Sequence, residues 1–231
     1  MKPKILVIAS EGYAKNIPHF MINTDYGKMV AEAGGLPLVA LGTKLAREYA
    51  ELADGLLLTD GPAIHRGKYG KIYHPDETVP PLSREREAME FMLCELFTSM
   101  GKPIFGIGRG MQVLNVFFGG SLKEHENLPL HSALPQENKT EFMYHVIRTN
   151  STNPIPNSQF EVNSAHTAIV DVMGKNLVAT AFAEDNTIEA IAHTTLPVLG
   201  VQWHPEHKET DDIISQKMLE HFICMCKEVS K

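Results

Sequence analysis

The first 120 residues alternate short apolar runs with stretches whose apolar positions repeat at helical spacing. Ile5 to Ala9 is an unbroken apolar run after Lys4, which is typical of a strand buried on both faces. Similar runs at Leu36 to Leu41, Gly55 to Thr59 and Pro103 to Ile107 predict three further strands. Because buried strands alternate here with helical segments, we expect a parallel sheet in this half of the chain.

Three segments between these runs are predicted to be helices. The first runs from Thr24, as its cap, to Ala33, where Gly34 and Gly35 end it. The others are Thr43 to Ala53 and the long segment Ser83 to Met100. The long segment carries an apolar stripe of methionine and leucine on one side, which indicates packing against the sheet rather than a binding surface.

After Ser121 the pattern changes to short apolar runs separated by turns, which predicts antiparallel strands added to the same domain. These runs are the segment around Val146, Leu177 to Phe182, Ile188 to His193 and Val198 to Gln202. Asp211 to Glu228 is predicted to be a closing helix. Residues 1–231 are therefore expected to form one α/β domain of three layers, with a mostly parallel central sheet flanked by helices.

Open parallel sheets bind ligands beyond the carboxyl ends of their strands, so the loops at that edge are the candidate site. The stretch from Asp60 to Pro81, rich in Gly, Pro and His, is a long loop of the kind that is functional or mobile. Gly106 to Gln112 reads as a strand that turns sharply into a helix, with Gly108 at the tip. In hydrolases such a turn holds a nucleophile, and the next backbone N–H faces the developing oxyanion.

His204 and Glu206 lie two residues apart just after an apolar strand, which fits an imidazole and the carboxylate that orients it. A solvated strand end is the simpler interpretation of this pair taken alone. His207 is close, and further histidines are scattered through loops, at His65, His74, His125 and His131. Structural zinc has a more regular ligand spacing, often with cysteines, so no metal site is expected. His145 and His193 fall on predicted strands and are expected to be core or edge residues.

Composition restricts the classes of partner. The formal charge of -7, with no cluster of Lys or Arg, argues against binding nucleic acid. Three cysteines form no disulfide framework, and no apolar run approaches the roughly 20 residues of a spanning helix. Because the start MKPKILVIAS lacks the apolar segment of a signal peptide, we expect a cytoplasmic protein that does not enter a membrane.

Taken together, these segments resemble the class I glutamine amidotransferases, and more closely the gamma-glutamyl-gamma-aminobutyrate hydrolase branch. Six short motifs fall in family order along nearly the whole chain. They are Ala33 to Pro37, Ala53 to Gly55, Gly101 to Pro103, Gly119 to Leu122, Val162 to Ser164 and Gly200 to Glu206. The resemblance implies the flavodoxin-like fold of class I glutamine amidotransferases, with no cofactor.

The resemblance also assigns roles to residues. In the family the elbow reads Gly-Ile-Cys-Arg-Gly, and its Cys attacks a gamma-glutamyl amide after activation by a His and a Glu of a Trp-His-Pro-Glu segment. This makes His204 the base, Glu206 its orienting partner and Gly108 the position of the missing nucleophile. None of the three cysteines lies in a corresponding motif, so Cys-dependent catalysis is expected to be absent. The implied substrate-binding residues are Asp60, Gly61, Arg109, Gln112, Ser164 and His166.

Two further departures from the family pattern accompany Gly108. A Gly-Gly stretch that serves the oxyanion hole is replaced by Thr59-Asp60-Gly61-Pro62, and a His-His-Gln stretch becomes His166-Thr167-Ala168. Asp60 would place an anion beside a developing oxyanion unless it points away. A single engineered change would explain Gly108 but not Asp60 or Ala168, which favours natural decay or repurposing of the site.

Three functions stay open at this point. The chain can bind a small gamma-glutamyl or other amino-acid-like ligand without efficient hydrolysis. It can hydrolyse gamma-glutamyl amides with water activated by His204. It can also be a non-catalytic interaction or regulatory subunit that partners a synthase or ligase. Self-association into a homo-oligomer stays open as well.

Overall fold

The structure, a computed structural model, describes residues 1–14, 17–72, 83–124, 131, 134–136, 139–150, 156–207 and 213–229. His74, His125 and the last part of the predicted long loop lie outside these ranges. Among the described residues, no helix has the length and apolar character needed to cross a membrane.

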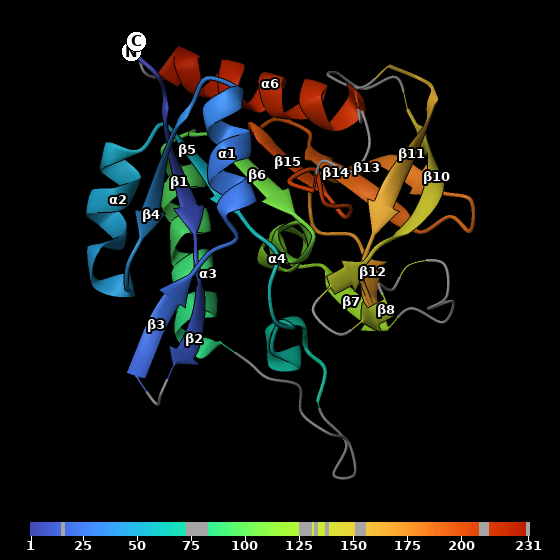
Figure 1. The fold of residues 1–231 in the computed structure, drawn as a ribbon, viewed down its shortest axis with the longest axis horizontal. Helices are drawn as coiled ribbons and strands as arrows, with labels where there is room; N and C mark the ends of the chain where they lie inside the picture. The colour runs from blue at the N-terminus through green and yellow to red at the C-terminus, as the bar shows by residue number, and fades with distance from the viewer. Residues whose placement is uncertain are drawn as a thin grey trace.

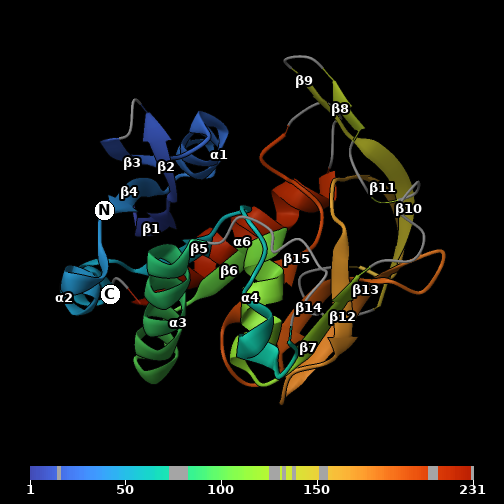
Figure 2. The same cartoon turned by 90° about the horizontal axis from the view of Figure 1, so that it is seen from below.

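In the part of the chain that the structure describes, a sheet of nine strands forms the centre of the fold (Figures 1 and 2). In order across the sheet, the strands are β11 (Gln159–Ser164), β10 (Met143–Thr149), β13 (Leu177–Ala183), β14 (Ile188–His193), β15 (Val198–Val201), β6 (Ile104–Ile107), β5 (Gly55–Leu58), β1 (Lys4–Ile8) and β4 (Leu36–Ala40). Neighbours from β15 to β4 are parallel, and neighbours from β11 to β15 are antiparallel. This arrangement confirms the predicted α/β class with a parallel core.

Helices cover both faces of the parallel part. One face packs against α1 (Thr24–Glu32) and α6 (Ile213–Val229), and the other against α2 (Ala46–Leu52), α3 (Arg84–Ser99) and α4 (Arg109–Phe117). Alternate residues of each strand face opposite sides of the sheet. Ile5 and Val7 pack against the layer of α1 and α6, whereas Leu6 and Ile8 pack against the opposite layer. The uninterrupted apolar runs are explained by this double burial.

Four details differ from the sequence prediction. Thr24 is the first residue of α1, and Asn23 is the cap, because the Asn23 side chain accepts a hydrogen bond from the Asp25 N–H. The segment Thr43 to Ala53 splits into the 3-10 helix η1 (Thr43–Leu45) and α2. The predicted long loop contains the 3-10 helix η2 (Arg66–Tyr69). Strand β15 was expected to be antiparallel throughout, yet it pairs in parallel with β6 and so joins the two halves of the sheet.

Three small antiparallel pairs were not predicted. They are β2 (Ser10–Ala14) with β3 (Ile17–Met21), β7 (Ser121–Glu124) with β12 (Ala168–Val172), and β8 (Leu134–Gln136) with β9 (Lys139–Glu141). The β2–β3 pair follows directly on β1 (Figure 1). Strands β1, β5, β6 and β15 run in the same direction, so the residues that follow them meet at one edge of the sheet.

Candidate functional site

Gly108 forms the tip of a sharp turn between β6 and α4. Its backbone has φ 56° and ψ -115°, in the left-handed region that side-chain-bearing residues adopt only under strain. Its N–H donates a hydrogen bond to the Val201 carbonyl at 2.8 Å, which fixes the tip against β15. A Cβ at Gly110 would lie 2.3 Å from the Leu58 carbonyl oxygen, so the first turn of α4 approaches β5 as closely as glycine allows. The structure therefore contains the predicted strand-turn-helix elbow.

The Asp60 carboxylate lies against this tip. Its Oδ1 atom accepts a hydrogen bond from the Arg109 backbone N–H at 3.0 Å. A Cβ built on Gly108 would be 2.7 Å from the same oxygen and 3.1 Å from His204 Cε1. In an elbow hydrolase the N–H of the residue after the tip faces the developing oxyanion. Here the Asp60 carboxylate already takes that N–H, and it does so in space that only a glycine tip leaves open.

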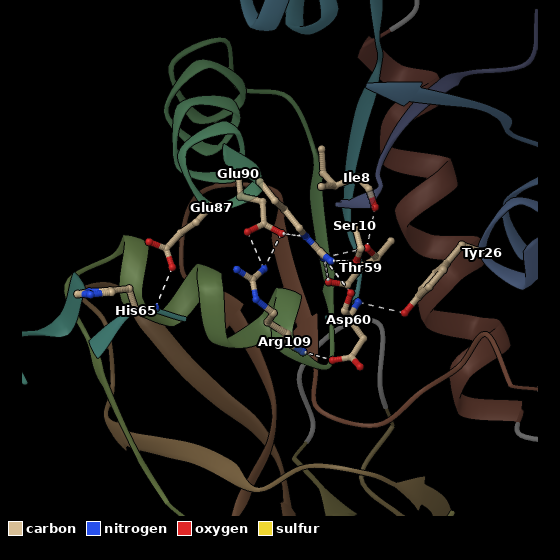
Figure 3. Close-up of polar contacts among 10 residues, drawn as sticks. Ile8, Ser10, Tyr26, Thr59, Asp60, His65, Glu87, Glu90 and Arg109 are labelled. Carbon is tan, nitrogen blue, oxygen red and sulfur yellow. Dashed lines mark hydrogen bonds and ion pairs between the residues drawn. The ribbon is translucent and has the colours of Figure 1, made fainter. Parts of the chain in front are cut away.

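The main chain of Asp60 is held from two sides (Figure 3). The Tyr26 hydroxyl accepts a hydrogen bond from the Asp60 N–H at 3.0 Å. From α3, Arg86 Nη2 donates to the carbonyl oxygens of Thr59 at 2.7 Å and of Asp60 at 2.8 Å. Arg86 also contacts the Ser10 hydroxyl, so one side chain ties together the residues that follow β1 and β5.

Glu90 of α3 lies between two buried arginines. Arg109 Nη1 is 2.6 Å from each Glu90 carboxylate oxygen, and Arg86 Nε donates to Oε1 at 2.8 Å (Figure 3). All three side chains are at most 3% exposed. Burial acts to raise the pKa of Glu90, but the charges of Arg109 and Arg86 outweigh it and hold the pKa below its ordinary value. The Arg109 guanidinium thus contacts α3, and only its backbone N–H faces Asp60.

His204 and Glu206 form a buried pair across the elbow. His204 Nδ1 lies 3.0 Å from Glu206 Oε1, which also accepts a hydrogen bond from the Tyr26 hydroxyl at 2.7 Å. Asn163 fixes the His204 main chain by accepting from its N–H at 2.8 Å and donating to its carbonyl at 2.9 Å. The structure therefore brings together the two side chains that the sequence paired.

The environment of His204 favours the imidazolium form. Burial disfavours the charge, but the Glu206 carboxylate and, to a smaller extent, Asp60 outweigh it and raise the pKa of His204 to about 9. His204 Nε2 is buried and has no hydrogen-bond partner among the described residues. At pH 7 the ring is therefore a cation with an unused N–H beside the tip of the elbow.

Glu206→Gln is expected to lower the pKa of His204 from about 9 to below its ordinary 6.5, because the carboxylate that outweighs burial is removed. An NMR pH titration of the histidine ring signals measures this change. His221 on α6 is the internal control, since its pKa should stay the same in both proteins. A His204 pKa that stays near 9 in the variant would show that Glu206 does not hold the charge.

The same ionisation makes the free energy of unfolding depend on pH. Because the folded-state pKa of His204 lies above its ordinary value, its contribution to stability is complete below about pH 6.5 and is lost as the pH rises through about 9. Urea unfolding of the native chain and of His204→Gln should therefore differ more at about pH 6 than at about pH 9.5. An equal difference at both pH values would contradict the charged pair.

A cleft of about 370 Å³ opens beside the elbow. Of the residues proposed from the sequence, Asp60, Gly61, His204 and Glu206 line it. Further lining residues, which were not among the site residues proposed from the sequence, come from β2, β3, α1 and loops. They are Ser10, Met21, Ile22, Asn23, Tyr26, Thr59, Phe142, Ala165 and His207. Two of them carried a signal in the sequence that could have placed them here: Thr59 begins the Thr59-to-Pro62 stretch, and His207 lies beside the His-Pro-Glu segment.

Residues 6–206 match the family described as peptidase C26. The chain belongs to the peptidase C26 family. Its relatives include gamma-glutamyl-gamma-aminobutyrate hydrolase PuuD of Escherichia coli strain K12, which is 30% identical, with 97% of this chain and 94% of the relative covered. Protein NtpR of Enterococcus hirae is 32% identical, with 84% of each chain covered.

A solved structure supports the fold of this peptidase C26 member. It comes from Thermoplasma acidophilum and is described as a GMP synthase subunit. The TM-score is 0.67 at 18% sequence identity, and the match covers 100% of this chain and 96% of the other. The chain thus has the mixed α/β fold of a class I glutamine amidotransferase-like protein, as its sequence motifs implied.

Four of the six residues proposed as substrate-binding are absent from the lining of the cleft of this C26 protein: Arg109, whose guanidinium contacts Glu90, and the three buried residues Gln112, Ser164 and His166. Gln112 Nε2 donates to the Ala168 carbonyl at 3.0 Å and to Gln202 Oε1 at 3.2 Å. Ser164 Oγ donates to the His131 carbonyl at 2.9 Å, and His166 Nε2 lies 3.5 Å from Glu189 Oε1. All three are buried and are absent from the cleft lining. Their contacts hold the walls behind the cleft together.

No cysteine is among the described residues that line this cleft. Cys94 is buried in α3, and Cys224 and Cys226 are on α6, where Cys224 is exposed and Cys226 is buried. Burial raises the pKa of both Cys94 and Cys226 above the ordinary thiol value, which keeps them protonated and unreactive. None of these three thiols therefore lies in the cleft beside Gly108.

Proposed function

We propose that this C26 protein binds a small amino-acid-like ligand of the gamma-glutamyl class, and that it lacks Cys-dependent amide hydrolysis. The observation that carries the proposal is the hydrogen bond from the Arg109 N–H to the Asp60 carboxylate, beside a tip that has no side chain. Both parts that acyl transfer needs, the nucleophile and an unoccupied oxyanion donor, are missing at the same point.

The missing nucleophile and the position of Asp60 each argue against Cys-dependent hydrolysis, for separate physical reasons. A glycine tip cannot form a thioester, because it has no side-chain atom to attack the amide carbon. An oxyanion that developed beside Arg109 N–H would meet the Asp60 carboxylate, which repels negative charge. Restoring only one of the two parts would therefore leave the other obstacle in place.

The charges around the cleft support a zwitterionic ligand. His204 presents a cationic ring with an unused Nε2–H, and Asp60 presents a carboxylate within the same cleft. These groups complement the carboxylate and the ammonium group of an amino acid. The cleft of about 370 Å³ is at the small end of the range for ligand pockets. The hydrolase relative in Escherichia coli is named for a gamma-glutamyl substrate, which fits this ligand class.

Calorimetry and thermal shift with L-glutamine, gamma-glutamyl-gamma-aminobutyrate and gamma-glutamyl polyamines test the proposal. We expect at least one of them to bind and raise Tm, with no release of glutamate. Asp60→Asn should weaken that binding about 10- to 100-fold, because a charge-assisted hydrogen bond is lost. Asp171→Asn, at an exposed position of β12 outside the cleft lining, is the matched control and should bind as the native chain does. No binding by any compound would overturn the proposal.

The intact His204 and Glu206 pair supports a second candidate, hydrolysis by water that His204 activates. The raised pKa of His204 argues against it, because an imidazolium cannot accept a proton from water at pH 7. Glutamate release that increases above about pH 9 and disappears in His204→Ala would make this candidate the better one.

The structural neighbour described as a GMP synthase subunit supports a third candidate, a non-catalytic subunit of a synthase. A partner would dock without any need for the missing thiol. Affinity capture with the native chain followed by size-exclusion chromatography tests it. Recovery of the chain alone, or only as a homo-oligomer, would count against a synthase partner.

A further inference from the structure

Outside the cleft, three histidines surround one buried glutamate. Glu189 lies on β14, His145 on β10, His166 just after β11, and His131 in the segment before β8. The side chain of Glu189 is fully buried, and the three histidine side chains are at most 8% exposed. His131 Nδ1 is 3.6 Å from Glu189 Oε1, and Nε2 of both His145 and His166 is 3.5 Å from the same oxygen. Four potential ligands from four segments thus converge on one point.

The separations in this cluster are those of ligands around an ion rather than of direct hydrogen bonds. A hydrogen bond from a ring nitrogen to a carboxylate is about 2.7–2.9 Å long when charge-assisted. Ligands held 2.0–2.1 Å from a tetrahedral zinc ion lie about 3.3 Å apart. Ligand atoms of His131, His166 and Glu189 all lie within 4.8 Å of one another, so an inward movement of at most about 1.5 Å would complete such a geometry.

The burial of the Glu189 carboxylate also favours a cation at this position. Neither of its oxygens has a hydrogen bond to the described residues, although the side chain is fully buried. A buried carboxylate without hydrogen bonds is costly unless a cation compensates it. The three ring nitrogens 3.5–3.6 Å from Oε1 supply part of that compensation, and a metal ion bound between them and Glu189 would complete it.

Asp185 orients one of the rings in the way that metal sites require. His131 Nε2 lies 3.0 Å from Asp185 Oδ2, while the other nitrogen, Nδ1, faces Glu189. Asp185 is itself fixed, since its Oδ1 accepts a hydrogen bond from the Thr187 N–H at 3.0 Å. Metal-binding histidines almost always donate their second N–H to such a carboxylate or carbonyl.

We propose that His131, His166 and Glu189 bind a divalent transition metal ion such as Zn²⁺, with His145 beside the fourth position. Imidazole and carboxylate ligands suit zinc and its neighbours in the first transition series. The site would be distinct from the cleft but linked to it. Ser164 Oγ donates to the His131 carbonyl, and the adjacent Asn163 holds the main chain of His204. A bound ion would therefore stiffen the strand β11 that positions His204.

Zinc binding by the full chain tests this proposal. The protein is stripped with a chelator, titrated with Zn²⁺ by calorimetry, and its metal content is measured after dialysis. We expect one ion per chain and a Tm that rises on addition of zinc. Substitution of cobalt(II) should give the visible absorption of a tetrahedral site with nitrogen and oxygen ligands.

Matched variants locate the ion. Glu189→Gln and His166→Gln should abolish tight binding, and Asp185→Asn should weaken it about 10- to 100-fold through His131. His207→Ala, which alters the separate group of His204, Glu206 and His207, should bind zinc as the native chain does. Circular dichroism of each variant establishes that it is folded, and the cobalt spectrum of the native chain gives a readout that needs no variant. No retained zinc, or zinc lost only in His207→Ala, would overturn the proposal.

Discussion

Gly108→Cys alone is expected to show no measurable hydrolysis of L-glutamine or gamma-glutamyl-gamma-aminobutyrate, whereas Gly108→Cys combined with Asp60→Gly is expected to release glutamate. The new Cβ would lie 2.7 Å from Asp60 Oδ1, and the carboxylate occupies the Arg109 N–H. Loss of one oxyanion donor costs about 10²- to 10³-fold in kcat, so the double variant should exceed the single one by at least that factor. A coupled assay of glutamate release measures the difference.

The control for this experiment is Gly108→Ala combined with Asp60→Gly. This variant also lacks the Asp60 carboxylate, but its tip carries a methyl group instead of a thiol, so it should be inactive. An acyl-enzyme trapped by mass spectrometry should appear only in the double variant, on the thiol introduced at the tip. Equal activity of Gly108→Cys with and without Asp60 would show that the carboxylate does not block the elbow. Equal activity of the native chain would show that no nucleophile is needed.

Glu90→Gln is expected to reduce the free energy of unfolding by about 3–5 kcal/mol, because it leaves the Arg86 and Arg109 guanidiniums buried without their shared carboxylate. Urea unfolding followed by circular dichroism at pH 7 measures the change. Acidification should reduce the free energy of unfolding of the native chain for the same reason, because it protonates Glu90. Its Glu90 pKa lies below the ordinary value, so this stabilisation is present above the ordinary pKa of 4.5 and is lost as the pH falls through the folded-state pKa.

Glu95→Gln on the same helix is the matched control, since Glu95 is exposed and its replacement should change stability by less than about 0.5 kcal/mol. A loss for Glu90→Gln no larger than that of the control would contradict the role of Glu90. The variant also tests the elbow, because Arg86 holds the carbonyl of Asp60 and Arg109 supplies its N–H partner.

The parallel half of the fold could be predicted because its strands are buried on both faces and so appear as continuous apolar runs, such as Ile5 to Ala9. The strands β2 and β3 could not, because Ser10–Ala14 and Ile17–Met21 form a two-stranded pair with exposed apolar residues such as Ile17 and Phe20. Strand β15 shows a second limit of structure prediction from the sequence. Its apolar run indicates a strand but contains no information on which neighbours lie beside it.

Some residues of the candidate site could likewise be predicted from the sequence, and others could not. Gly108, His204 and Glu206 follow strands directly, and the edge of a parallel sheet brings such residues together. Tyr26 was missed because it lies in the apolar pattern of α1, although its hydroxyl joins Asp60 to Glu206. The cluster around Glu189 was missed because its members come from separate strands and loops with no regular spacing, and they meet only through the order β11-β10-β13-β14 of the folded sheet.

The close approach of Asp60 to Gly108 also bears on the history of the site. If the ancestral elbow carried a cysteine, its Cβ and the present Asp60 rotamer would have excluded one another. In that case the carboxylate could take its present position on the Arg109 N–H only after the tip had lost its side chain. Once it was there, a mutation back to cysteine would restore a thiol but no activity, so selection could not favour that first step. The pair would act as an evolutionary ratchet, in which the second substitution makes the first one permanent.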